Sequence, residues 1–323
     1  MKLGLTGTPI ENSLSELKSL FDLILPGYLG SEEDFRDRYG PGDGDEDSWR
    51  LANLRRLTAP FVLRRLKTTV LDELPEKIED VRTCSLSEEQ LSLYQQAITT
   101  KGVALMEKLR RDKEPLPYIH IFALLNLLKQ ICDHPALALN SVERFELHDS
   151  GKWDLYQELI SESLASGQKV VVFTQYLGMI AIMEKHLEQL GVESVTLTGA
   201  SRRRGEIVDR FNEDPDCRVF LGSLKAGGTG IDLVGGSVVI HYDRWWNAAR
   251  EDQATDRLYR IGQRRVVQVF KLFTENTLEE RIAAIIDRKR RLMEEVVQED
   301  DPRLNKIFTR EELIELLQGP KEE

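Results

Sequence analysis

Apolar residues in the second half of the chain alternate between short β-type runs and helical patterns. The β-type runs cover residues 169–174, 192–198, 218–222, 237–243 and 266–272. Between the first two runs, Ile180, Met183, Leu187 and Leu190 recur at helical spacing, and Gly191 can end that helix. This strand–helix alternation predicts an α/β fold with a parallel sheet. Because the runs are almost continuously apolar, we expect helices on both faces of the sheet.

The middle of the chain follows a helical pattern instead. Ser87, followed three residues later by Gln90, fits a capping box, and Pro115 and Pro117 interrupt the pattern. One apolar stripe at helical spacing consists of Ile121, Leu124, Leu125, Leu128 and Ile131. The pattern predicts an α-helical insertion at about residues 86–147, before the sheet.

The two ends of the chain carry weaker signals. Thr309 and Glu312 fit a capping box ahead of an apolar group, which predicts a short C-terminal helix within residues 301–323. Residues 2–6 form a β-like run, but one strand with nothing before it cannot build a sheet domain. We expect this run either to join the later sheet or to belong to a longer protein of which the chain is a part, and we favour the second interpretation.

Composition limits the class of protein. The 323 residues include 44 Lys and Arg against 55 Asp and Glu, for a net charge of −11. The acidic total argues against a surface coated with basic charge, although a local basic groove remains compatible with it. Three cysteines without a CxxC spacing exclude a disulfide scaffold, and no apolar run approaches the roughly 18 residues of a membrane helix. We expect about two domains in a cytoplasmic protein, nucleoid-associated if bacterial or archaeal.

Residues 253–263, with the sequence QATDRLYRIGQ, carry the strongest chemical signal. Arg257 and Arg260 lie three positions apart, so on a helix they would share one face. Two guanidinium groups on one face form a permanently charged clamp for phosphate. A solvated basic face is the competing interpretation, and this segment alone does not decide between the two.

Two neighbouring segments add to this signal. Residues 222–233 are rich in glycine and follow a predicted strand, where backbone N–H groups can approach a phosphate, although a simple tight turn fits as well. The segment lacks the GK[ST] ending of a Walker loop. Trp245 and Trp246 follow the next strand; they fit either a core position or packing against nucleic acid, and the core is favoured for at least one of them.

Other apparent motifs carry no function. Gly151 and Lys152 are followed by Trp153, so they form no P-loop. Cys132 and His134 stand alone, and no metal site is predicted from them.

In their order, the motifs resemble the C-terminal half of a Swi/Snf-type ATPase, a DNA translocase with the superfamily-two helicase fold. Residues 5–12 and 20–27 resemble the family's third motif, and residues 61–67 and 74–77 the crossing between its two lobes. The segments leading into the second lobe are matched by residues 128–135 and 150–152, and motifs four to six by residues 170–176, 222–233 and 253–263. Departures from the family pattern are Leu224, Lys225, Ala248 and Tyr259.

The resemblance implies a domain organisation. Residues 1–65 would be the terminal part of the first helicase lobe with a helical protrusion, residues 66–300 a second RecA-like lobe, and residues 301–323 a tail helix. The family's Walker A lysine and Mg-binding Asp-Glu pair belong to the first lobe. The resemblance places both of these motifs ahead of residue 1. ATP and Mg are therefore expected as cofactors without a metal site in this chain, and we do not expect the chain alone to hydrolyse ATP.

The resemblance also implies roles for particular residues. Arg257 and Arg260 would act as arginine fingers on the γ-phosphate, with Gln253, Gly230 and Asp232 near the nucleotide. The expected DNA contacts are Thr174, Gln175, Arg204, Ser223, Lys225, Gly228, Trp246 and Asn247. The expected interlobe residues are Thr6, Glu11, Arg64, Arg65 and Lys67. Expected partners are duplex DNA, the first lobe of the same protein, and RNA polymerase or another DNA-bound protein, with no membrane.

Competing functions stay open at this stage. The closest alternative is a lobe of an RNA-directed or RNA-polymerase-associated ATPase of the same superfamily. A non-catalytic interaction module is a second alternative, in which the helices bind a partner and the arginines are surface charges. A Rossmann-type enzyme is disfavoured, because no GxGxxG with a following acid is present.

Overall fold

The computed structural model describes residues 2–5, 14–39, 46–63, 74–110, 118–224, 230–245, 248–285 and 310–317. The chain divides into two compact units. The first comprises residues 1–72 and 286–309, and the second comprises residues 73–285 and 310–323.

The first unit is helical in its described part. It contains α1 (Leu14–Ile24), α2 (Glu32–Tyr39), α3 (Glu46–Thr58) and the 3-10 turn η1 (Ala59–Phe61). Leu14, Leu17 and Phe21 lie on one face of α1 and pack in a small core with Phe35 and Leu54. Residues 2–5 form no strand, so the expected β-like run at residues 2–6 is wrong in its described part; a single extended run finds no ladder partner there.

The second unit is built on one sheet of parallel strands. Its strands are β1 (Lys77–Cys84), β2 (Val170–Thr174), β3 (Ser194–Leu197), β4 (Val219–Ser223), β5 (Val238–His241) and β6 (Val267–Thr274), in the order β1-β6-β5-β2-β4-β3. The predicted parallel α/β fold is confirmed, and each of the predicted runs corresponds to one of β2 to β6.

The edge strand β1 was not predicted. It pairs with β6 from Lys77 opposite Val267 to Cys84 opposite Thr274. Most of its side chains are exposed, so its sequence, KIEDVRTC, lacks the apolar run of a covered strand. Its charges are paired instead: the Glu79 carboxylate lies 2.6 Å from the ammonium groups of both Lys77 and Lys271.

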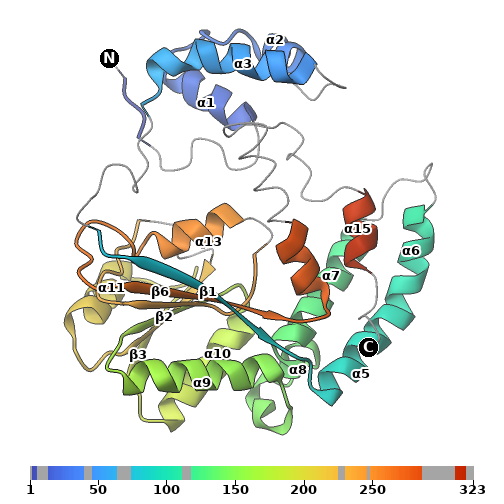
Figure 1. Cartoon of the computed structure of the whole chain (residues 1–323), viewed down its shortest axis with the longest axis vertical. Coiled ribbons are helices and arrows are strands. Elements are labelled where there is room, and N and C mark those ends of the chain that lie inside the picture. Colours follow the sequence, from blue (N-terminus) through green and yellow to red (C-terminus); the bar gives the residue numbers. More distant parts are fainter. Residues whose placement is uncertain are drawn as a thin grey trace. The chain divides into compact units, whose positions relative to one another are not determined.

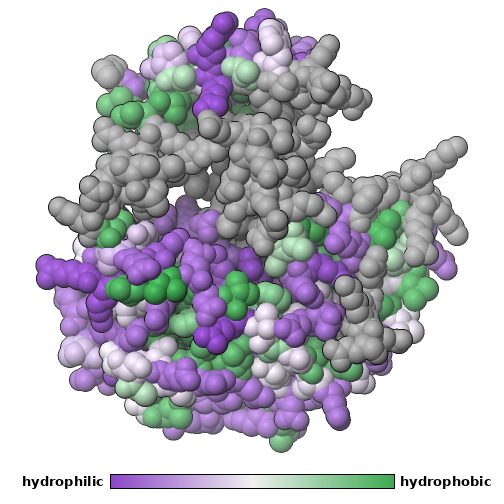
Figure 2. All heavy atoms as spheres, in the orientation of Figure 1, coloured by the Kyte–Doolittle hydropathy of each residue, from purple (hydrophilic) through white to green (hydrophobic). Residues whose placement is uncertain are grey.

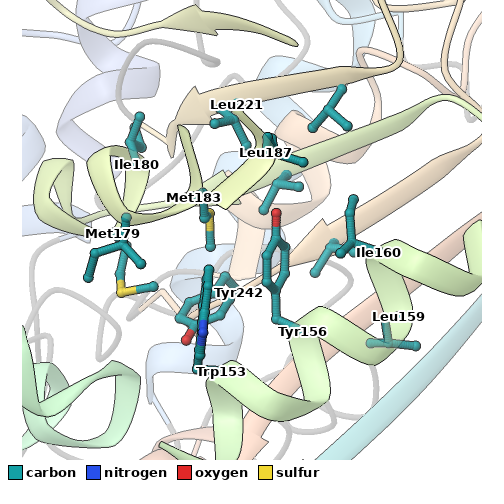
Figure 3. Packing of buried hydrophobic residues seen from close by; sticks show 14 of the residues in the cluster. Trp153, Tyr156, Leu159, Ile160, Met179, Ile180, Met183, Leu187, Leu221 and Tyr242 are labelled. Carbon is teal, nitrogen blue, oxygen red and sulfur yellow. The ribbon is translucent and has the colours of Figure 1, made fainter. Parts of the chain in front are cut away.

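Helices cover both faces of the sheet, as the apolar strands predicted. On one face lie α9 (Gly151–Ala165) and α10 (Leu177–Gln189), and on the other α11 (Arg204–Glu213) and α13 (Ala248–Thr255) (Figure 1). On the α9–α10 face, the rings of Trp153 and Tyr156 stack with centroids 5.1 Å apart beside the apolar face of α10 (Figure 3). The predicted stripe on α10 is confirmed at Ile180, Met183 and Leu187.

A group of helices precedes α9. It comprises α5 (Glu88–Ala97), the π-type turn η2 (Ile98–Gly102), α6 (Val103–Arg110), α7 (Tyr118–Asp133), α8 (Pro135–Ala138) and the 3-10 turn η3 (Val142–Leu147). The capping box of Ser87 and Gln90 is present, and the predicted stripe of α7 is buried. The tail helix α15 (Arg310–Leu316) contacts α6, and residues 278–285 are helical.

The described residues visible in Figure 2 are mostly hydrophilic, and the hydrophobic ones among them lie in small separate groups. Scattered apolar residues of this kind are normal on a protein surface. Within the described ranges, no helix combines the length and the apolar character that a membrane crossing requires.

A buried ion cluster joins α7, α9 and the segment after β6. The Lys152 ammonium lies 2.8 Å from the Asp133 carboxylate and 2.5 Å from that of Glu279, and all three side chains are fully buried. Burial alone would lower the pKa of Lys152, but the carboxylates of Asp133 and Glu279 raise it above its ordinary value. Lys152 is therefore a charged structural residue, in agreement with the expectation that Gly151 and Lys152 form no P-loop.

Replacing Lys152 by Met should destabilise the fold strongly. Losing one partner of a buried ion cluster costs about 3–5 kcal/mol, because the remaining carboxylates stay buried without compensation. The matched control is Lys185→Met, which removes an ion pair to Glu146 whose two side chains are 43% exposed and which, screened by solvent, contributes little to stability. Urea unfolding measures both variants, and equal losses of stability would contradict the role assigned to the cluster.

His241 links the sheet to α13. Its Nε2 and the hydroxyl of Thr255 share a hydrogen bond of 2.8 Å, and its ring stacks on Phe173. Burial, with the nearby charges of Lys271 and Arg244, lowers the pKa of His241 to about 3. The imidazole is therefore neutral in the folded protein at physiological pH.

Acid should weaken the fold through His241. The unfolded histidine binds a proton near pH 6.5 and the folded one only near pH 3, so its contribution to stability is complete above pH 6.5 and falls below it. Between pH 7.5 and 5.5 the wild type should lose about 1.4 kcal/mol more than His241→Asn, as measured by urea unfolding. His120→Asn, at an exposed position, is the control and should keep the wild-type pH dependence; a His241→Asn protein that also keeps it would refute the assignment.

Candidate functional site: the arginine segment and the strand ends

Two of the predicted functional residues, Thr174 and Ser223, lie at the carboxyl edge of the sheet. Thr174 ends β2 and Ser223 ends β4, and the two residues are direct partners in the β2–β4 ladder. Parallel strands place their carboxyl ends at one edge, where α/β proteins bind ligands. The structure thus brings two residues of the fourth and fifth motifs side by side, although they are far apart in the sequence.

Arg257 and Arg260 lie on turns and not on a helix, which corrects the expectation of a shared helical face. Helix α13 ends at Thr255, and the following turns are held by hydrogen bonds from Leu258 N to Thr255 O, at 3.0 Å, and from Gln263 N to Arg260 O, at 3.0 Å. Gly262, in the last of these turns, has a φ of +103°, which glycine adopts readily. Arg257, Arg260 and Gln253 are all half-buried.

Gln263 holds the arginine segment (residues 253–263) against the residues that follow Gly230. Its Nε2 donates to the Gly236 carbonyl at 2.8 Å, and its Oε1 accepts from the backbone N–H groups of Arg264 and Arg265 at 2.9 and 3.0 Å. In addition, the Leu233 N–H donates to the Arg257 carbonyl at 2.8 Å. Sequence analysis recognised Gln263 only as the end of a motif.

An ion pair joins the two segments at the surface. The Arg260 guanidinium contacts the Asp232 carboxylate, so two residues predicted to serve the nucleotide are neighbours. Beside them is an open pocket of about 430 Å³. It is lined by residues of α11 and of the glycine segment (residues 222–233), including Gly230 and Asp232. Arg204 also lines this pocket, which places it with the predicted nucleotide residues; its predicted DNA contact stays a prediction.

The residues predicted to contact DNA at the end of β2 are held by one buried carboxylate. The Asp243 carboxylate accepts from the Thr174 hydroxyl, and from the Gln175 N–H at 3.0 Å. Thr174 and Ser223 are buried, whereas Gln175 is half-buried. Burial raises the pKa of Asp243, although the positive charge of Lys129 opposes this change. Sequence analysis missed Asp243, whose signal was an acid directly after an apolar strand.

One of the two tryptophans, Trp245, packs against the hydrophobic core. Trp245 is half-buried, packs against the core on the α11–α13 face, and has the Arg250 guanidinium 6.0 Å from its ring centroid. This confirms the core interpretation for one ring. Several predicted residues lie outside the described residues, so their roles stay predictions: Lys225, Gly228, Trp246, Asn247, Thr6, Glu11, Arg64, Arg65 and Lys67.

The site does not fit a resident metal ion in the part of the chain that the structure describes. No group of three or more His, Cys, Asp or Glu side chains there is arranged to hold one. The described residues of the site offer guanidinium, amide and carboxylate groups.

Comparison with known protein families gives two matches along the chain. The family described as SNF2-related domain matches residues 1–137, and the helicase conserved C-terminal domain matches residues 151–262. The second match contains the ends of β2 and β4 and most of the arginine segment.

Two curated relatives show the range of proteins that are similar in sequence to this chain. A Bacillus subtilis protein named as an ATP-dependent helicase/translocase is 41% identical over 93% of the chain, which covers 33% of that protein. The human TATA-binding protein-associated factor 172 is 32% identical over 98% of the chain, which covers 20% of its length. The chain thus spans a third or less of the length of these relatives.

Solved structures show the same relationship. The Sulfolobus solfataricus SWI2/SNF2 ATPase core in complex with double-stranded DNA is 34% identical, with a TM-score of 0.59; the match covers 97% of this chain and 65% of that one. The C-terminal domain of the Sulfolobus solfataricus SWI2/SNF2 ATPase is 31% identical, with a TM-score of 0.57, and the match covers 76% of this chain and 99% of that one. With a RecA-like parallel sheet and the helicase motifs in the family's order, the chain belongs to the SWI2/SNF2 family of superfamily-two, helicase-like ATPases.

Proposed function

We propose that the chain acts as the second RecA-like lobe of a DNA-dependent ATPase that moves along duplex DNA and remodels protein–DNA complexes. The observation that carries the proposal is the position of Arg260, which pairs with Asp232 beside an open pocket next to α11. A half-buried guanidinium beside an open pocket is suited to meet a phosphate presented by a facing surface.

The chemical role of the arginines follows from their charge and geometry. Charge spreads over the phosphoryl oxygens in the transition state of ATP hydrolysis, and an arginine finger that meets it accelerates turnover by about 10³–10⁵. Arg257 and Arg260 would supply this charge, while Gln253 would hydrogen-bond near the same phosphate. Gly230 and Asp232 would line the nucleotide side of the pocket.

The DNA role rests on the ends of β2 and β4. Gln175, with Lys225 and Gly228, would face the phosphates of one strand, and the buried Thr174 and Ser223 would hold the strand ends behind them. Trp246, Asn247 and Arg204 would support this surface. Phosphate contacts position a protein on DNA without reading the base sequence, so we expect a weak preference for DNA sequence. A related SWI2/SNF2 core solved with double-stranded DNA supports this proposal, and the TATA-binding protein-associated relatives support a DNA-bound protein as the remodelled partner.

Replacing Arg260 should abolish ATP turnover in the full-length protein. Arg260→Ala should lower kcat by about 10³-fold or more and leave ATP affinity within a few-fold, because the finger acts on the transition state. The matched control is Arg264→Ala, which removes an exposed arginine just after the same segment and should keep wild-type turnover. Steady-state hydrolysis with duplex DNA, duplex RNA and no nucleic acid measures these effects. Near-normal turnover in Arg260→Ala would exclude the finger role, and stimulation by RNA alone would favour the RNA-directed alternative.

Salt should separate the two candidate roles of Arg204. If its guanidinium contacts a DNA phosphate, Arg204→Gln should reduce the slope of log affinity against log salt by about 1. Arg210→Gln is the control on the same helix, since Arg210 pairs with Glu193 at 2.6 Å, and it should leave the slope unchanged. Fluorescence anisotropy with labelled duplex DNA gives the slope. An unchanged slope with weakened ATP binding would assign Arg204 to the pocket instead.

A further inference from the structure

One short segment, Tyr242–Trp245, is the meeting point of three parts of the second unit; we name it the junction segment. The Asp243 carboxylate accepts from Thr174 and from the Gln175 N–H, at the end of β2. The other end of the junction segment binds Glu251 of α13, whose Oε1 accepts from the Trp245 N–H at 2.6 Å and from Arg244 Nε at 3.2 Å. The predicted DNA contacts and the helix that leads to the arginines are therefore tied to the same backbone.

The third part is α7 of the helical group. Lys129 on α7 is fully buried, and its ammonium donates to the Arg244 carbonyl at the centre of the junction segment. Four residues further along α7, the Asp133 carbonyl accepts from the Tyr242 hydroxyl at 2.8 Å. The positive charge of Lys129 also lies close enough to Asp243 to favour its ionised carboxylate.

Burial makes these contacts demanding in geometry. An ammonium group removed from water is tolerated only where carbonyl or carboxylate oxygens replace its hydration. Lys129 finds one of these oxygens on the junction segment, so a displacement of that segment would take this contact away from a buried charge. The junction segment is consequently held in one place relative to α7.

The consequence reaches the arginine segment through α13. Glu251 and Thr255 lie one helical turn apart on α13, and the turns carrying Arg257 begin directly after Thr255. We propose that Lys129 is a positioning residue that makes the DNA-facing end of β2 and the arginine segment move as one body, so that DNA contact controls the placement of Arg257 and Arg260. This inference rests on the proposed function and adds to it the residue that couples DNA to ATP turnover.

The activity test uses Lys129→Met in the full-length protein. Lys129→Met should lower the stimulation of kcat by duplex DNA by about tenfold and leave KM for ATP within about twofold, because misplaced arginines affect the transition state and not nucleotide binding. The matched control is Lys169→Met. Lys169 is also buried and donates to two backbone carbonyls, those of Phe211 and Asp214, each at 2.6 Å, but it precedes β2 at the opposite edge of the sheet. Loss of stimulation in both variants, or in neither, would overturn the proposal.

A second measurement needs no activity. Hydrogen exchange on the 323-residue chain should show at least about tenfold faster exchange of the α13 amides in Lys129→Met and unchanged exchange there in Lys169→Met. Unchanged α13 exchange in a folded Lys129→Met protein would overturn the positioning role. If the wild-type full-length protein shows no DNA-stimulated hydrolysis, the proposed function fails while the exchange result still decides whether Lys129 positions α13.

A third variant covers poor folding of Lys129→Met. Glu251→Gln keeps the size of the side chain and removes the charge that binds Arg244 and the Trp245 N–H, so it should reproduce both effects in smaller degree. A folded Glu251→Gln protein with wild-type DNA stimulation and wild-type α13 exchange would refute the role of the junction segment.

Discussion

The placement of buried charge on the helical group is the constraint on which the second unit depends. Lys152 compensates Asp133 and Glu279, and Lys129 compensates the carbonyl of Arg244 near Asp243. Each of these groups would be costly alone in an apolar interior, and each is tolerated because oppositely charged or carbonyl groups from another element lie at hydrogen-bonding distance. The helices before α9 are thereby fixed to the ends of β5 and β6, where the apolar contacts of the sheet alone would leave more freedom.

This arrangement explains how a sheet with an apolar interior presents a polar edge. Strands β2, β4 and β5 are fully buried along their length, and the chemistry begins where they end. At that edge, Asp243 organises the end of β2, while Gln263 and Asp232 hold the arginine turns and Arg260 against the segment that precedes β5. These polar groups bind one another, and such preorganisation is what the proposed arginine fingers would require.

Much of the site could be recognised from the sequence because its residues are close together in the chain. The glycine segment and the arginine segment each carry a dense local pattern, and their order along the chain identified the family. Arg204 shows the limit of this reasoning. Its neighbours in sequence do not indicate that it shares a pocket with Gly230 and Asp232, which are more than twenty residues away. The exposed strand β1 was not predicted for a related reason. It is held by its backbone pairing with β6, a distant part of the chain, and not by an apolar pattern in its own sequence.

The sequence by itself determined the parallel α/β class, the strands β2 to β6, the helical group and the family, because apolar periodicity and motif spacing are local properties of the chain. Only the tertiary structure decided that Arg257 and Arg260 lie on turns, that Lys152 is a buried ion partner, and that Lys129 reaches the junction segment. The physical reason is that a charged side chain looks the same in sequence whether it is solvated or buried. Its role is set by the oxygens that the fold brings to it from distant elements.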